Sequence, residues 1–123
     1  MKKHLIIALM ALLPVACSGS DEPEVTLDPA AVAAGKKVFT DKGCAGCHGD
    51  TGTGDGAAAA ALPVKPRNYS DAKWQSETTD EQLMKVINEG GAANGLNVTM
   101  AAYPDIKGDD MKNLITFIRS LKK

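Results

Sequence analysis

The segment that most constrains this chain is Cys44-Ala45-Gly46-Cys47-His48. Its two thiols stand three residues apart, a spacing that lets both of them add across the two vinyl groups of one haem. The imidazole of His48 follows the second thiol directly, so the covalent link would hold it beneath the iron as a ligand. The pattern therefore predicts one covalently attached haem c, bound through Cys44 and Cys47 and ligated by His48.

Three other interpretations of these residues are weaker. A structural zinc site needs four ligands, and the neighbours Cys47 and His48 can hardly both reach one metal. A thioredoxin-like redox disulfide lies among alternating strands and helices, which the surrounding sequence lacks. A plain structural disulfide explains neither His48 nor the glycine-rich segment that follows it. Haem attachment remains the main prediction.

The beginning of the chain has the features of an export signal. Lysines follow Met1, and an apolar run then extends from Leu5 to Ala16. A membrane-spanning anchor needs about 20 apolar residues, more than this run provides. We therefore expect residues 1–16 to be a signal peptide. Export supports the haem assignment, because c-type haem is attached outside the cytoplasm.

Cys17 directly follows the apolar run and resembles the lipidated cysteine of a bacterial lipoprotein signal. In such signals the cysteine carries lipid, and the polar stretch behind it tethers the domain to the membrane. Leu13 lies one position earlier than the pattern prefers, so soluble secretion with cleavage after Ser20 is the alternative. We expect residues 17–27 to be a flexible linker and the product to be a periplasmic, membrane-tethered lipoprotein.

Composition and charge limit the size and the partners of the protein. A chain of 123 residues, 44% hydrophobic and 4% aromatic, has room for one modest domain, expected to be monomeric. A mature form beginning at Cys17 has 12 basic and 15 acidic side chains, a net charge of −3. This balance argues against nucleic acid and favours redox proteins or respiratory complexes that present a basic docking patch.

The segment after the linker begins with signals of a helix. Asp28 is a candidate N-cap, Pro29 suits the first helical position, and alanines follow, so a helix should reach about Thr40. Five glycines within residues 46–56 then predict a loop. A short helical turn is expected over residues 57–61, ended by Pro63 and Pro66.

Two further helices are predicted in the second half of the chain. Thr79 and Gln82 match a capping box before an apolar helical face. A glycine opens residues 90–99, which lack any period and predict a loop leading to Met100. Asp109 can cap the last helix, in which apolar side chains recur at helical spacing. Because no alternating strand pattern occurs, the fold class should be all-α.

Taken together, these features resemble class I cytochromes c. The resemblance rests on Gly35, Phe39, residues 44–48, Met100 and residues 110–121, and it covers roughly residues 30–121. It implies a small cytochrome c fold over residues 28–123, with crossing N- and C-terminal helices and a haem in the core. In the family a glycine and an aromatic on the first helix cross an aliphatic and an aromatic on the last, positions matched by Leu114 and Phe117. The glycine lets the two backbones approach closely.

The second iron ligand is predicted to be Met100. His4 leaves with the signal, so His48 is the only histidine of the mature chain. Met84 and Met111 lie in expected helices, where flexible core filling is their role. Met100 lies in a loop able to wrap around the haem. The alternatives for Met100 are core packing and an iron site that stays open.

The resemblance also suggests contacts around the haem. In the family a proline segment supplies the carbonyl that accepts a hydrogen bond from the second imidazole nitrogen, which makes Pro63 or Pro66 the candidate partner of His48. Both prolines could instead merely stiffen a loop. Candidate donors to the haem propionates are Arg67, Asn68, Tyr69 and Trp74. A solvent-facing Arg67 and a core Trp74 are the alternatives.

Ligation by histidine and methionine predicts what the domain does. Six ligands in both oxidation states mean that little rearranges when an electron moves, and methionine raises the reduction potential. No nucleophile with a base and no paired carboxylates are evident, so the prediction is an electron carrier, not an enzyme, working between periplasmic or membrane-associated redox partners. An open-site haem enzyme, a gas or peroxide sensor, and a fixed haem subunit of a larger oxidoreductase are the alternatives.

Overall fold

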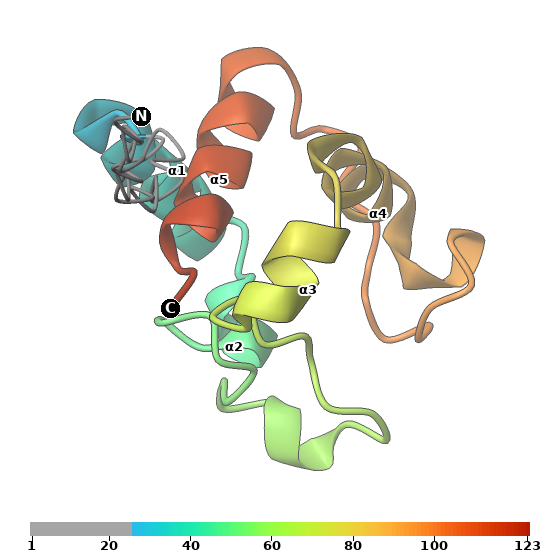
Figure 1. Cartoon of the computed structure of the whole chain (residues 1–123). Coiled ribbons are helices and arrows are strands. Elements are labelled where there is room, and N and C mark those ends of the chain that lie inside the picture. Colours follow the sequence, from blue (N-terminus) through green and yellow to red (C-terminus); the bar gives the residue numbers. More distant parts are fainter. Residues whose placement is uncertain (1–25) are drawn as a thin grey trace, which may run out of the picture.

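The computed structural model describes residues 26–123, in which every regular element is a helix (Figure 1). The elements are α1 Pro29–Asp41, α2 Ala45–His48, the 3-10 helix η1 Ala59–Ala61, α3 Ala72–Glu77, α4 Asp80–Ala93 and α5 Gly108–Ser120. The predicted all-α class is confirmed. No helix of this described part has the length and apolar character needed to cross a membrane. The expected signal peptide, Cys17 and all but the end of the linker lie outside the described residues.

Two helices begin as the sequence predicts. The carboxylate of Asp28 accepts a hydrogen bond from the amide of Ala30 at 3.0 Å and caps α1. The capping box of α4 is complete, because the Gln82 amide donates to the Thr79 hydroxyl at 3.2 Å while the Gln82 side chain accepts from the Thr79 amide at 2.8 Å. Both caps satisfy backbone donors that the start of a helix leaves free.

Helices α1 and α5 lie side by side (Figure 1). Their closest approach is at Gly35. A Cβ added to Gly35 would lie 1.9 Å from the carbonyl oxygen of Asn113 and 2.8 Å from Cβ of Phe117. Only glycine therefore fits at this crossing. The rings of Phe39 and Phe117 pack beside it with their centroids 5.2 Å apart. The crossing of the first and last helices, expected from the resemblance, is present.

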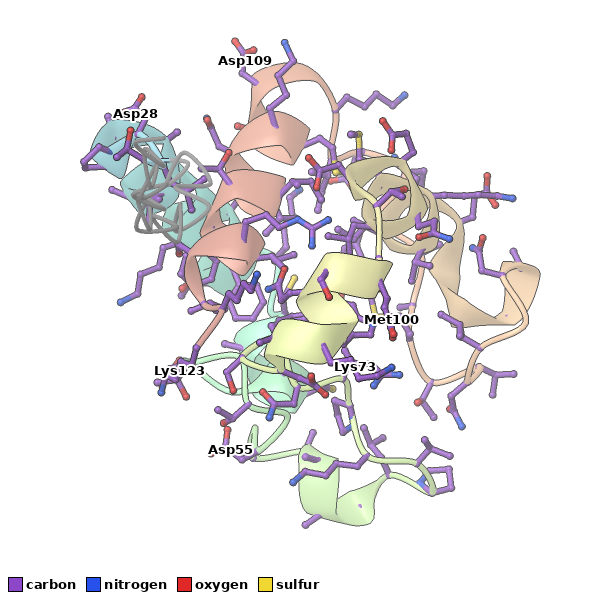
Figure 2. The ribbon with its side chains drawn as sticks, viewed as in Figure 1. Asp28, Asp55, Lys73, Met100, Asp109 and Lys123 are labelled. Carbon is purple, nitrogen blue, oxygen red and sulfur yellow. The ribbon has the colours of Figure 1, made fainter. Side chains whose placement is uncertain are left out.

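The core lies between this helix pair and α4. Its largest fully buried side chains are Phe39, Ile106, Leu114 and Ile118. Met111 is buried among them and Met84 packs against the same cluster, so both methionines fill the core. Met100 is half-buried on the segment that joins α4 to α5 (Figure 2).

Three local predictions are corrected. Asp109 does not cap α5, which begins at Gly108 after Lys107, two residues earlier than a cap at Asp109 predicts, and has no side-chain cap. Asp109 lies in the first turn and points outward (Figure 2). There its carboxylate still suits the positive end of the helix dipole. The glycine-rich segment predicted as loop contains α2, a single turn closed by the His48 amide on the carbonyl of Cys44 at 2.9 Å. One turn tolerates Gly46 because few residues must be held helical.

The third correction concerns the end of α4, and α3 is a helix that the sequence pattern does not predict. The six residues of α3 are too few to show a helical period, although Asp71 caps the helix by accepting from the Trp74 amide at 3.1 Å. In α4 the backbone leaves helical geometry at Gly90, with φ 81° and ψ 170°, as the expected stop requires. One more turn follows, so the predicted loop over residues 90–99 begins with a helical turn.

Candidate haem site

A cavity of about 890 Å³ opens between α2, α3, α4 and the segment before α5. That volume lies within the roughly 300–1,000 Å³ typical of cofactor sites. Among its lining residues are Cys44, Cys47, His48, Pro66, Arg67, Asn68, Tyr69, Trp74 and Met100. The fold thus brings together residues that lie more than fifty positions apart in the chain. Of the predicted site residues described here, Pro63 alone is not part of this lining, and it is exposed.

The two cysteines occupy one turn and are free thiols. Cys44 precedes α2 and Cys47 lies within it, so a spacing of three places both side chains on one face of the turn. Burial raises the pKa of the Cys44 thiol and keeps it protonated. The structure has no disulfide between them, and no three His, Cys, Asp or Glu side chains gather as a metal site within residues 26–123. The disulfide and zinc interpretations therefore find no support in the described part.

His48 is buried, with 7% of its surface exposed, and its ring is held from both nitrogens. Nδ1 lies 3.1 Å from the carbonyl oxygen of Arg67, to which it must donate because a carbonyl only accepts. In the neutral ring Nε2 then carries no proton, and an unprotonated imidazole nitrogen can bind a metal. Burial lowers the pKa of His48, although the Arg67 carbonyl partly opposes this, so the ring is neutral at pH 7.

This contact corrects the predicted partner of His48, which is Arg67 and neither Pro63 nor Pro66. The carbonyl of Pro66 points instead at Gly54, where an added Cβ would lie 2.4 Å from the Pro66 oxygen. Successive carbonyls of this irregular segment face different neighbours, and the one after Pro66 meets the imidazole. The prediction found the right segment and missed the acceptor by one residue.

Tyr69 packs on His48, a contact that sequence spacing gave no means to find. The two rings stack with centroids 4.6 Å apart and planes 15° apart. The Tyr69 hydroxyl lies 3.2 Å from Nε2 of His48, and burial raises the pKa of that phenol, so it is a neutral donor. Binding of iron at Nε2 requires this hydroxyl to leave the nitrogen. The sequence suggested Tyr69 only as a donor to the haem propionates.

Arg67 and Trp74 form another corner of the cavity. The guanidinium of Arg67 lies 5.5 Å from the centroid of the Trp74 ring, within the range of a cation–π contact. Trp74 is half-buried, and its ring centroid lies 5.5 Å from that of Tyr69. Both side chains line the cavity, so the predicted contacts with haem propionates are sterically open to them and stay a prediction.

The residues present fit a covalently attached haem. Two thiols lie on one turn beside a neutral imidazole, and a thioether from a distant segment lines the same largely apolar cavity. Imidazole and thioether are the ligand pair found in electron-transfer haem proteins. One described contact must change for iron to bind, because the Tyr69 hydroxyl has to leave Nε2.

Comparison with known proteins defines the class. The family model for cytochrome c matches residues 32–122, so the chain belongs to the cytochrome c family and takes haem c as its cofactor. The chain is 38% identical over 88 residues to cytochrome c oxidase subunit 2 of Alkalihalophilus pseudofirmus, a match that covers 72% of this chain and 25% of that protein. A solved structure described as KustC0563 c-type cytochrome has 29% identity and a TM-score of 0.57, over 72% of this chain and 98% of the other.

These matches confirm the cytochrome c fold and haem-based electron transfer as the general function. The chain spans about a quarter of the length of the curated relative that it matches. The activity and partners of that whole protein therefore do not transfer to this chain directly.

Proposed function

We propose that this protein carries single electrons through one haem ligated by His48 and Met100, and that it catalyses no reaction of its own. The supporting observation is the single cavity that joins the Cys44 and Cys47 thiols, the buried imidazole and the thioether. Bound haem supplies a one-electron iron couple, and ligation by histidine and methionine keeps its geometry nearly unchanged between the two oxidation states.

The chain's own residues hold one side of this arrangement firmly. His48 is buried, and its Nδ1 donates to a backbone carbonyl, which fixes the orientation of the ring and raises its basicity. The turn that carries it is closed by backbone hydrogen bonds to Cys44. A ligand fixed in this way moves little when the charge on the iron changes, which suits electron transfer.

We propose a respiratory partner for the carrier. The similarity to a cytochrome c oxidase subunit supports a partner in a respiratory chain, and the export-like N-terminus supports a periplasmic location with a lipid at Cys17. Mass measurement of the mature N-terminus tests the lipid. A mass that matches cleavage after Ser20 would remove the tether.

The charges around the cavity differ from those expected for a protein that docks on a basic patch of its partner. Its exposed charged residues are Lys65, Arg67 and Lys85 against one acidic side chain, Glu77. The negative charge of the mature chain therefore lies elsewhere, and the rim itself suits an acidic partner surface. Electron exchange with a small anionic iron complex should slow as salt is added. If electron exchange with this complex instead becomes faster with salt, the rim repels anions, and a partner with a basic docking patch is the better expectation.

The decisive test of the ligand pair is spectroscopic. The oxidised, matured protein should show the weak red absorption band of an iron–methionine sulfur bond, and Met100→Leu should abolish it. Met84→Leu is the matched control, since Met84 packs against the core and should leave the band intact. A parent protein that lacks the band and binds carbon monoxide readily when reduced would replace the carrier with the open-site enzyme or sensor.

A further inference from the structure

The segment that carries Met100 is hydrogen-bonded by its backbone to the end of α4. The Gly91 amide donates to the Met100 carbonyl at 2.9 Å, and the Leu96 amide donates to the Gly91 carbonyl at 2.8 Å. Farther along, the Tyr103 amide donates to the carbonyl of Ile87 at 2.8 Å. Both backbone groups of Gly91 are thus bonded to the segment that leads to Met100.

Gly90 also lies close to the segment that carries Met100. Its φ of 81° turns the chain out of the helix, and its carbonyl accepts from the Asn94 side chain at 2.9 Å. A Cβ at this position would lie 3.0 Å from the Met100 oxygen and 3.1 Å from the Ala102 nitrogen. Both distances are shorter than ordinary van der Waals contact, so the segment would have to move.

Gly91 is more tightly confined, and not because of its own backbone conformation, since its φ is not positive. A Cβ on Gly91 would lie 2.0 Å from the carbonyl oxygen of Asn97 and 3.2 Å from Cβ of Met100. The Asn97 oxygen would have to retreat by about 1.4 Å to reach the 3.4 Å of an ordinary contact. That same oxygen accepts from the Met100 amide at 3.3 Å, so its movement displaces Met100 as well.

The residues directly before Met100 do not anchor the segment through their side chains. Leu96 is 55% exposed and Val98 is 76% exposed, so neither large apolar side chain anchors the loop in the core. Asn97 and Thr99 form only a local turn, in which the Asn97 side chain accepts from the Thr99 amide at 2.9 Å. Before Met100 the segment is therefore positioned by its backbone contact with the two glycines, and after Met100 the Tyr103 bond to Ile87 also holds it.

We propose that Gly90 and Gly91 are positioning residues that hold the Met100 sulfur on the iron. This inference rests on the proposed function, in which Met100 is the second iron ligand. Neither glycine lines the cavity. Because they have no side chains, the loop can contact the backbone of α4 directly. A side chain at either position would displace the loop and move the Met100 sulfur away from the iron.

The test compares Gly91→Ala with Gly95→Ala in the matured protein, in which covalent attachment keeps the haem bound when the methionine leaves. Gly95 lies in the same loop with φ 68°, and an added Cβ would meet no atom within 4 Å. Imidazole added to the oxidised protein competes with Met100 for the iron, so its affinity reports how often the sulfur is off. Gly91→Ala should weaken the red band and bind imidazole at least about tenfold more tightly, and Gly95→Ala should match the parent.

Equal imidazole affinity in Gly91→Ala and the parent overturns the positioning role. An equal gain in Gly95→Ala also overturns it, because general loop strain would then explain both. If Gly91→Ala does not mature, Gly90→Ala decides, since a Cβ at Gly90 would lie 3.0 Å from the Met100 oxygen and Gly95→Ala shares its positive φ. Tighter imidazole binding in that variant supports the inference, and unchanged binding overturns it.

The parent spectrum separates this inference from the proposed function. If Met100→Leu leaves the red band of the parent unchanged, Met100 is not the second iron ligand, and the positioning role is refuted as well. If the band depends on Met100 but Gly91→Ala leaves it and the imidazole affinity unchanged, only the positioning role is refuted.

Discussion

The most quantitative consequence of the fold concerns Gly35 at the crossing of α1 and α5. In Gly35→Ala the new methyl group would lie 1.9 Å from the Asn113 oxygen and 2.5 Å from its carbonyl carbon. These are backbone atoms of a helix and cannot rotate aside, so the cost lies at or above the top of the roughly 1–3 kcal/mol of overpacking. Alanine returns up to about 1 kcal/mol through its better helix propensity. The net loss in the free energy of unfolding should be about 2 kcal/mol or more.

Guanidinium unfolding of the matured protein, followed by far-UV circular dichroism, measures this loss. A loss of about 2 kcal/mol corresponds to a fall in melting temperature of about 8–16 °C for a domain of this size. Ala34→Gly is the matched control, because Ala34 is exposed on the same helix and should lose only about 1 kcal/mol of helix propensity. A Gly35→Ala protein as stable as the parent would refute the close crossing.

Three further predictions address single contacts. Gln75→Leu should lower the free energy of unfolding by about 2 kcal/mol in chemical denaturation, because buried Gln75 donates to two backbone carbonyls, each at 2.8 Å, and an unchanged midpoint would deny those bonds. Thr79→Ala removes the cap of α4 and should cost about 1 kcal/mol, whereas Thr79→Ser should retain most of the stability. Lys42 lowers the pKa of Asp105 by donating to its carboxylate, so the pair's contribution to stability is present above the ordinary aspartate pKa and is lost as pH falls through the lowered value. In Lys42→Met, NMR titration should return the pKa of Asp105 toward its ordinary range.

Features that depend on neighbours in the chain could be predicted from the sequence. The spacing of cysteines and histidine within residues 44–48 predicts haem c, the cofactor of the family to which the chain belongs. The capping residues Asp28 and Thr79 predict where two helices begin. Gly35 could be identified only through the resemblance to class I cytochromes c. Its role is a contact between distant segments, of which spacing alone carries no trace.

Features that depend on how loops fold over the site could not be predicted. Which carbonyl meets His48 depends on the turn of the backbone between η1 and α3, where no periodic pattern constrains the direction of each peptide. The stacking of Tyr69 on His48 joins residues 21 positions apart through such loops. Helix α3 was missed for a different reason, since six residues are too short to show a helical period, although Asp71 offered a cap.

The two predicted iron ligands are held by different contacts, and this difference affects how substitutions could change the reduction potential. His48 directly follows Cys47, a predicted attachment point, is buried, and has Nδ1 bonded to a backbone carbonyl. Met100 lies on a segment whose neighbouring apolar side chains are exposed and whose seat is the glycine pair at residues 90–91. Changes in the loop should therefore alter the strength of the sulfur ligand while leaving the histidine in place. Because the methionine ligand raises the reduction potential, substitutions that loosen this loop should lower the potential before they affect haem attachment.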